Sequence, residues 1–375
     1  MSQEPAFTLG IEEEYHLVDR ASGALAVAPP DLLDACQAKL AGQVMKEFLQ
    51  SQIEVATRPC RSLAEARADL VRLRGAIIEE CAARGLAPIA AATHPFAEWR
   101  NASPSEGARY QQLAEELQGA GRRLMICGMH VHVGIEDDEL RIDLMNQLVY
   151  FLPHLLALAT SSPFWRGEPT GLKSYRLTIF DGLPRTGLPE VFEGWSEYQR
   201  LVQRLVEPGL IEDASRLWWD IRPSARFPTL EMRIADATPR LADVLCLAAL
   251  YRCLLRMLWR LKRQNQRWRL YSRHLIRENR WRAQRRGTEA DLVDFGRGEK
   301  VPFAELLEEL LHLTAPDAEA LDCVAEVAHA RTILADGTSA DRQLRVYHAA
   351  LAAGADRAEA LRAVVQSLIE ETAAL

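Results

Sequence analysis

Three consecutive carboxylates occupy a strand-like segment near the start of this 375-residue chain. Alternation along an extended strand places Glu12 and Glu14 on one face, about 7 Å apart, together with His16. Glu13 falls on the opposite face, among the apolar side chains of Leu9, Ile11, Tyr15 and Leu17. Two carboxylates at that spacing repel each other unless a cation lies between them. The segment therefore predicts a site for a hard divalent metal ion.

Three later segments divide in the same way into an apolar and a polar face. Their polar faces hold His130 and His132 (within 124–135), Ser174 and Arg176 (within 173–180), and Glu231 and Arg233 (within 228–235). Oxygen ligands suit a metal ion and guanidinium groups suit an anion, so the pattern predicts a site that binds both. The role of His132 stays open between a half-buried structural histidine and a site residue.

The segment 47–56 adds two further carboxylates, Glu47 and Glu54. Seven residues apart, they face opposite ways on a regular strand, so both can reach one site only across a bulge or a helical turn. Glu54 is the stronger candidate on this ground, and a surface position is the alternative for Glu47.

The chain alternates between these half-polar segments and amphipathic helices. Helices are expected at 62–84, with Ser62 as N-cap, at 139–159, with a kink at Pro153, and from Thr238-Pro239 past 258, with Thr238 as N-cap. The segments 7–18, 47–56, 124–135, 173–180 and 228–235 are predicted to be antiparallel strands, because buried parallel strands are apolar on both faces.

We therefore expect an α+β fold, with an antiparallel β-sheet and helices packed on one of its faces. One domain should cover residues 1–375, with a sheet core over about 7–240 and a helical part over about 240–375. Breaks in the helical part are expected near Pro316, Gly337 and Gly354.

Composition argues against several classes of protein. A formal charge of −7 disfavours nucleic acid as the main partner, and charged residues interrupt the apolar segment 241–258, which disfavours a membrane span. The seven cysteines form no CxxC pair, and residues 1–8 lack the basic and apolar regions of a signal peptide. These features predict a cytoplasmic protein with reduced thiols.

Seven stretches of the chain, in order from residue 10 to residue 287, together indicate a family resemblance. They are GIEEEYHLVD (10–19), EFLQSQIEVAT (47–57), CGMHVHVG (127–134), SSPFWRGEPTGLKSYR (161–176), DGLPRTGLP (181–189), WWDIRPSARFPTLEMRIADATP (218–239) and ENRWRAQRRG (278–287). Together they resemble the carboxylate–amine ligases of the glutamate–cysteine ligase type 2 family. The resemblance implies a glutamine-synthetase-like catalytic fold, in which ATP lies over an antiparallel sheet and carboxylates of adjacent strands hold Mg²⁺.

The resemblance also implies roles for individual residues. The implied metal ligands are Glu12, Glu14, Glu47, Glu54, His130 and Glu231. Arg176 and Arg233 are implied to bind the acyl phosphate or the γ-phosphate. The implied reaction is ATP-dependent formation of a C–N bond, in which a carboxylate becomes an acyl phosphate and an amine displaces phosphate. Glutamate–cysteine ligase activity, giving γ-glutamylcysteine, follows from the family alone, and small-molecule substrates and a homodimer are expected.

Residues 252–286 carry thirteen Lys and Arg side chains against one acid, Glu278. A nucleic-acid surface is one interpretation. We favour a helix whose basic face binds ATP phosphates or the protein's own acidic surface, with Arg280, Arg282 and Arg286 as candidates for the nucleotide side. The alternative function is a nucleotide-sensing regulatory protein that uses this basic helix to bind a partner.

Overall fold

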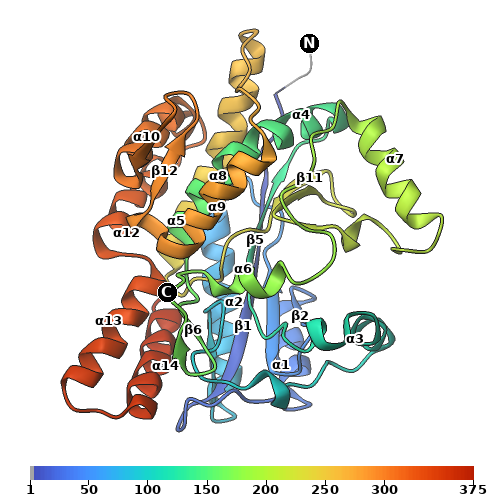
Figure 1. Ribbon diagram of the computed structural model, residues 1–375. Helices are drawn as coiled ribbons and strands as arrows, with labels where there is room; N and C mark the ends of the chain where they lie inside the picture. The colour runs from blue at the N-terminus through green and yellow to red at the C-terminus, as the bar shows by residue number, and fades with distance from the viewer. Residues whose placement is uncertain (1–3) are drawn as a thin grey trace.

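A seven-stranded sheet occupies the centre of the computed structural model, which describes residues 4–375 (Figure 1). Six strands follow the order β10-β11-β5-β1-β3-β2, and β4 pairs with β1 outside this path. Their bounds are β1 (Leu9–Asp19), β2 (Val44–Lys46), β3 (Gln52–Ala56), β4 (Leu86–Ile89), β5 (Met129–Gly134), β10 (Ile221–Pro223) and β11 (Thr229–Met232). Each pairing is antiparallel, which confirms the predicted α+β class.

Helices α2 (Leu63–Ala82), α4 (Asp138–Leu148) and α8 (Leu241–Arg263) pack against one face of the sheet. That face carries the apolar side chains predicted from alternation, and Leu9, Ile11, Met129 and Val131 are buried in the main core. The opposite face is polar. The division follows from the two-residue period of extended strands, which sends consecutive side chains to opposite faces.

A buried arginine neutralises Glu13 on the helix-covered face. Arg74 of α2 donates from Nε to Glu13 Oε2 at 2.9 Å, and it also donates to the carbonyl oxygens of Thr238 and Pro239. The predicted cap of α8 by Thr238 is wrong, because α8 begins at Leu241 without a side-chain cap. The carbonyls that would start the helix earlier bind the Arg74 guanidinium instead.

Two predicted strands differ in the structure. Residues 175–180 form a short helix, α6 (Tyr175–Phe180), in place of a strand, and the Arg176 amide donates to Ser162 Oγ at 3.0 Å. A run this short is compatible with either period, so alternation alone cannot decide its structure. The segment 47–56 is extended only from Gln52, because residues 47–51 turn the chain from β2 into β3.

Helix boundaries mostly follow the predicted signals. Ser62 caps α2, since its Oγ accepts from the Glu65 amide at 3.1 Å. Pro153 lies in the first turn of α5 (Leu152–Ala159), which follows a 3₁₀ turn. Gly337 and Gly354 lie between helices as predicted. Pro316 does not end a helix as expected: it lies inside α10 (Phe303–Ala320), whose buried side chains continue on both sides of the proline.

The stretch Asp138–Ala159, which comprises α4 and α5, is long and apolar enough to cross a membrane by length and composition. However, 89% of its most apolar window is buried inside the protein. Its side chains face the sheet and α8 rather than the surface, as expected for a core helix of a folded domain.

The remaining elements surround this centre. The helices are α1 (Leu32–Leu40), α3 (Ala108–Gly121), α7 (Trp195–Val206), α9 (Arg273–Arg286), α11 (Val324–Ala328), α12 (Ala330–Asp336), α13 (Ser339–Ala352) and α14 (Arg357–Ala373). Three small two-stranded sheets pair β6 (Phe164–Trp165) with β7 (Glu168–Pro169), β8 (Thr186–Gly187) with β9 (Trp218–Trp219), and β12 (Asp291–Asp294) with β13 (Glu299–Pro302).

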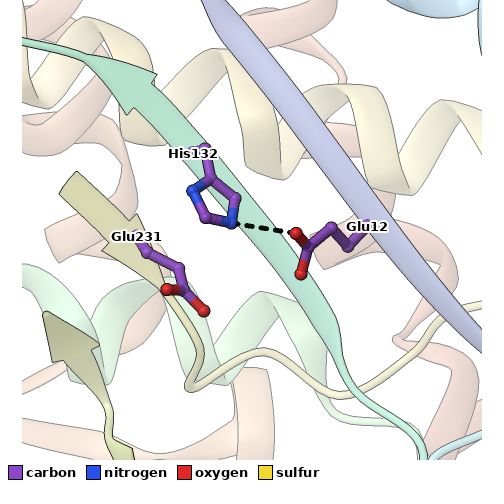
Figure 2. Close-up of side chains that lie close together, drawn as sticks. All are labelled: Glu12, His132 and Glu231. Carbon is purple, nitrogen blue, oxygen red and sulfur yellow. Dashed lines mark ion pairs between the residues drawn. The ribbon is translucent and has the colours of Figure 1, made fainter. Parts of the chain in front are cut away.

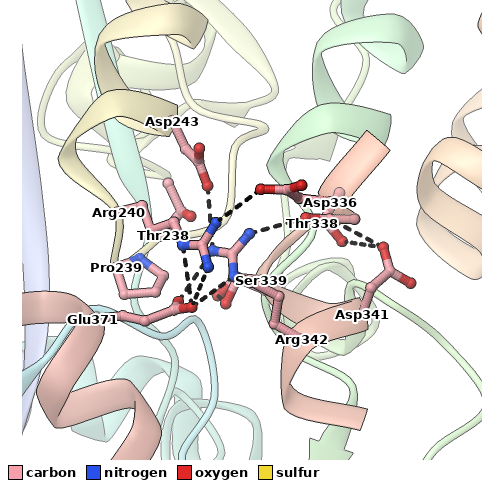
Figure 3. Close-up of polar contacts among 12 residues, drawn as sticks. Thr238, Pro239, Arg240, Asp243, Asp336, Thr338, Ser339, Asp341, Arg342 and Glu371 are labelled. Atoms are coloured by element: carbon pink, nitrogen blue, oxygen red, sulfur yellow. Dashed lines mark hydrogen bonds and ion pairs between the residues drawn. The ribbon is translucent and has the colours of Figure 1, made fainter. Parts of the chain in front are cut away.

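A network of ion pairs attaches α13 and α14 to the start of α8 (Figure 3). Arg342 of α13 donates to Asp243 Oδ2 at 3.2 Å and to Glu371 Oε1 of α14 at 2.8 Å. Arg240, immediately before α8, donates to the same Glu371 oxygen at 3.1 Å. Charge-assisted bonds thus connect the C-terminal helices to the helix that covers the sheet.

Candidate active site

The polar face of the sheet forms the floor of a cavity of about 560 Å³, with side chains of α3, α6 and the segment 215–222 along its walls. Eight of the residues singled out in the sequence meet in this region. Seven line the cavity directly: Glu12, Glu14, Glu47, Glu54, His130, Arg176 and Arg233. The eighth, Glu231, lies beside them and forms ion pairs with two arginines that line the cavity.

Strand register brings these side chains together. The directly opposed pairs on this face are Glu14 and Glu54, Glu54 and Met45, Glu12 and His130, and His132 and Glu231. Opposed residues have their Cβ atoms about 5 Å apart, so their side chains share one space. The turn at 47–51 brings Glu47 to the same cavity as Glu54, which a regular strand could not do.

Glu12, His132 and Glu231 converge from three neighbouring strands (Figure 2). One ligand atom from each lies within 4.8 Å of the others, close enough to share a metal ion. His132 Nε2 lies 3.2 Å from Glu12 Oε1, and His130 Nδ1 lies 3.2 Å from Glu12 Oε2. His132, whose role the sequence left open, therefore lies beside the carboxylates predicted from the sequence.

This set of donors fits Mg²⁺ or a similar divalent ion. Carboxylate oxygens are its preferred ligands, and imidazole nitrogen is compatible with divalent transition metals. His130 Nε2 is buried and makes no hydrogen bond within the described part of the chain, although it faces Glu14 Oε1 at 3.8 Å. A buried polar atom without a partner is costly, so a bound cation and its water would complete this side of the cavity.

The carboxylates of the cavity experience different electrostatic environments. Burial raises the pKa of Glu12, but hydrogen bonds with His130 and His132 outweigh burial and hold this pKa well below its usual value. Burial also raises the pKa of Glu14, and nearby Arg176 offsets only part of that effect. Burial lowers the pKa of His130 to about 4. The carboxylates of the cavity, which follow one another across the sheet as a row, therefore differ. Glu12 is firmly ionised, whereas the negative charge of others is poorly compensated.

Glu54 shows this deficit of positive charge most clearly. Burial, followed by the charges of Glu12, Glu47 and Glu14, raises its pKa well above 4.5. A carboxyl group with a raised pKa binds its proton more tightly in the folded state. Its contribution to stability is therefore complete below pH 4.5 and is lost as the pH rises through the folded-state pKa.

We expect Glu54→Gln to raise the free energy of unfolding of the metal-free protein by about 1–2 kcal/mol at pH 8 and to flatten its pH dependence above pH 5. Urea unfolding in EDTA between pH 5 and 8 measures this. The exposed Glu136, changed to Gln, is the matched control. An unchanged pH dependence in Glu54→Gln would show that other groups compensate this charge.

Arg176 of α6 reaches the cavity through space left by Gly128. A Cβ atom on Gly128 would lie 3.0 Å from Arg176 Cζ and closer still to Nη2. The guanidinium donates to the carbonyl oxygens of Arg233 at 3.2 Å and Ile234 at 3.4 Å. Its Nε is buried without a hydrogen-bond partner among residues 4–375. A buried guanidinium with an unused donor beside a cavity is suited to binding an anion.

Asp236 fixes the segments around Arg176. It accepts three hydrogen bonds, from the Ser161 amide at 2.9 Å, Ser162 Oγ at 2.8 Å and Ser174 Oγ at 2.9 Å. Its Oδ1 lies 4.0 Å from Arg176 Nη1. Ser161 Oγ in turn donates to Ser339 Oγ at 2.9 Å, at the start of α13. The position of Arg176 therefore depends on a hydrogen-bonded chain that reaches the C-terminal helices.

Glu231 lies between two arginines. Arg222 donates from Nε to Glu231 Oε2 at 2.9 Å, and Arg233 Nη1 contacts Oε1. Burial raises the pKa of Glu231, but both arginines outweigh burial and hold this pKa well below its usual value. Sequence reasoning missed Arg222. Arg222 alternates with the buried Ile221, which is the only signal in the sequence that points to it. A strand of three residues is too short for alternation to be recognised from the sequence.

The three nucleotide-side candidates from the basic segment lie outside this cavity. Arg280 donates to Asp220 Oδ2 and Asp181 Oδ2, both at 2.7 Å, and lines a different hollow beside α9. Arg286 lines a third hollow, and Arg282 donates to the carbonyl of Asp291 at 3.3 Å. Their role on the nucleotide side stays a prediction.

Known proteins resemble this chain at two levels: members of one family by sequence, and more distant proteins by fold. A family model described as "Glutamate-cysteine ligase family 2(GCS2)" matches residues 8–367. The chain is 64% identical over 377 residues to a Rhodospirillum rubrum protein, covering 99% of this chain and 97% of that protein. It is 57% identical to a Jannaschia sp. protein, covering 97% and 96%. Both bear the name "Putative glutamate--cysteine ligase 2".

Solved structures share the fold at low sequence identity. A Francisella tularensis glutamate–cysteine ligase, crystallised in complex with AMP, matches with a TM-score of 0.70 and 14% identity over 100% of this chain and 90% of that chain. A Pasteurella multocida bifunctional glutathione synthetase matches with a TM-score of 0.67 and 15% identity over 97% of this chain and 52% of that chain. The family match covers nearly the whole sequence, and the chain belongs to glutamate–cysteine ligase family 2.

Proposed function

We propose that this protein is an ATP-dependent carboxylate–amine ligase that works through an acyl phosphate. The observation that supports this most directly is the meeting of four carboxylates and three arginines in one cavity over an antiparallel sheet. The family and the names of its members suggest glutamate as the acid and cysteine as the amine, with γ-glutamylcysteine as the product.

In such a reaction, a substrate carboxylate oxygen attacks the γ-phosphorus of ATP, and ADP leaves. The neutral amine nitrogen then attacks the acyl carbon; phosphate leaves with the electrons of the broken C–O bond and accepts the proton that the nitrogen loses. The chain must hold two anions close together and bind the charge that spreads over the transferred phosphoryl group.

Arg176 and Arg233 are placed for that work. Arg176 is a buried residue, and the Nε atom of each arginine is buried without a hydrogen-bond partner in the part of the chain that the structure describes. A planar guanidinium can bind two phosphoryl oxygens at once, and burial strengthens this attraction relative to water. Because neighbouring backbone and carboxylates already fix both side chains, little reorganisation is needed when the anion arrives.

Mg²⁺ would be held by carboxylates of the cavity together with one of the two histidines. The carboxylates are those of Glu12, Glu14, Glu47, Glu54 and Glu231, and the histidine is His130 or His132. Bound there, Mg²⁺ would neutralise charge on the phosphate oxygens. Without it, the carboxylates would repel both the nucleotide and the acid substrate.

The regulatory alternative relied on a basic helix available to a partner. In the structure, Arg256 and Arg260 form ion pairs with Asp317, and Lys262 pairs with Asp143. Much of the basic segment therefore binds the protein's own acidic groups, as the favoured interpretation of the sequence expected, and gives the alternative no specific support.

Release of ADP from MgATP and glutamate, across a panel of amines that includes cysteine, tests the proposal. We expect amine-dependent release, a matching amide by mass spectrometry, and no release in EDTA. Arg233→Lys should lower the rate about 10²-fold, because a point charge cannot replace the planar fork. ATP binding without turnover for any acid and amine would contradict the proposal.

A further inference from the structure

The row of carboxylates ends at an apolar side chain. Glu14 lies opposite Glu54, and Glu54 lies opposite Met45 of β2, so these three side chains follow one another across the polar face of the sheet. Met45 is 39% exposed although it lies beside a buried, charged cavity. The surface that a substrate meets therefore changes from carboxylate to thioether at the edge strand.

A second cavity of about 380 Å³ begins at this apolar edge. Leu33, Met45, Lys46 and Gln52 line both cavities, so the two cavities adjoin along these side chains. The far walls of the second cavity are mainly apolar and include Val27, Pro29, Leu32 and Ile53. Its volume lies in the range of small-molecule pockets and is much larger than the side chain of cysteine requires.

The charges of the two cavities are distributed unevenly. Arg176 and Arg233, the groups suited to phosphate, lie by β5 and β11, whereas the apolar cavity lies by β2, with β1 and β3 between them. Glu54 and Glu47 lie near the junction, and Lys46 and Glu106 carry opposite charges within the apolar cavity. An amine is cationic before it reacts, so its nitrogen would be attracted to the negative charge of Glu47 and Glu54 that a bound metal ion leaves uncompensated.

We propose that the second cavity binds the substituent of the acceptor amine, and that the acceptor is a primary amine with an extended apolar group in place of the cysteine that the relatives' names suggest. The nitrogen lies over the end of the carboxylate row, and the apolar group passes Met45 into the cavity lined by Val27 and Pro29. This inference rests on the proposed function only in treating the bound amine as a substrate of the ligase. The binding of the amine itself can be measured without turnover.

Titration calorimetry of ethylamine, butylamine and hexylamine into the protein with MgCl₂ and ADP tests the inference. Burial of each methylene should strengthen binding about threefold to fourfold, so hexylamine should bind about 10²-fold more tightly than ethylamine. Val27→Trp, at a position 56% exposed on the cavity rim, should remove most of this gain by filling the space. Met45→Ala should reduce it several-fold.

Val191→Trp is the matched control, because Val191 is 47% exposed and lines neither cavity. We expect it to bind all three amines as the unmodified protein does, and all variants to bind ADP equally. Affinity that does not grow with chain length would overturn the inference. So would a loss of ADP affinity in Val27→Trp, because the cavity would then hold the nucleotide base. Failure of the ligase proposal would instead appear as absent ADP release with amine binding intact.

Discussion

Glu12→Gln should slow Mg²⁺-dependent ADP release by about 10³-fold or more while the fold is retained. Glu12 is the carboxylate that both histidines approach at 3.2 Å, and it belongs to the group of three side chains that could hold one ion. The glutamine keeps the size of the side chain but removes its charge. Its loss also leaves two buried imidazoles without the anion that they contact.

Two measurements separate loss of the metal from loss of the fold. MgCl₂ should stabilise the unmodified protein by about 2.7 kcal/mol at a concentration of one hundred times its Kd, and should stabilise Glu12→Gln much less. Far-ultraviolet circular dichroism should be unchanged. Glu136→Gln, at an exposed position beyond β5, should behave as the unmodified protein in both respects. ADP release at a near-normal rate would remove Glu12 from the site.

Gly128→Ala should lower kcat about 10²-fold, which is the scale expected when a catalytic group moves by about 1 Å. The added Cβ would lie 3.0 Å from both Arg176 Cζ and His130 Nε2. The guanidinium ends a flexible side chain and can shift at the cost of its hydrogen bonds to the Arg233 and Ile234 carbonyls. Stability should therefore fall by only about 1–2 kcal/mol while the phosphate-binding geometry is lost. Turnover and urea unfolding, measured on the same preparation, distinguish these effects.

Gly10→Ala is the matched control for this substitution. Gly10 lies on the neighbouring strand, opposite His132, and a Cβ atom there would meet only His132 Cβ at 3.5 Å, an ordinary contact. Its rate should stay within about twofold of the unmodified protein, because nothing that binds phosphate has to move. Equal rates in both alanine variants would show that Arg176 does not need its observed position.

Alternation along strands predicted the larger part of this site. It placed Glu12, Glu14, His130 and Glu231 on one face correctly, because each lies in a strand covered by helices on the other face. It could not place Glu47, whose approach to the cavity depends on a turn between two strands. Register, which decides that His132 meets Glu231, depends on pairing between segments about 100 residues apart and leaves no local signal.

Distant partners also explain why some local patterns differ from the contacts in the structure. Thr238-Pro239 has the composition of a helix start, but the distant Arg74 takes the carbonyls that the first turn would need. Arg280 belongs to a basic segment that resembles a nucleotide site, but Asp181 and Asp220 neutralise it from other parts of the fold. Neither partner can be identified from the neighbouring sequence.

The hydrogen-bonded chain from Asp236 through Ser161 to Ser339 has a consequence for how such proteins diversify. The C-terminal helices contribute no side chain to the cavity, yet Ser339 and Gln343 hold the segment on which Asp236, and through it Arg176, depends. The part of the chain before α13 and the two helices α13 and α14 are therefore not interchangeable modules. A chimera of two relatives joined just before α13 would keep a working cavity only if both parents share the contacts at that junction.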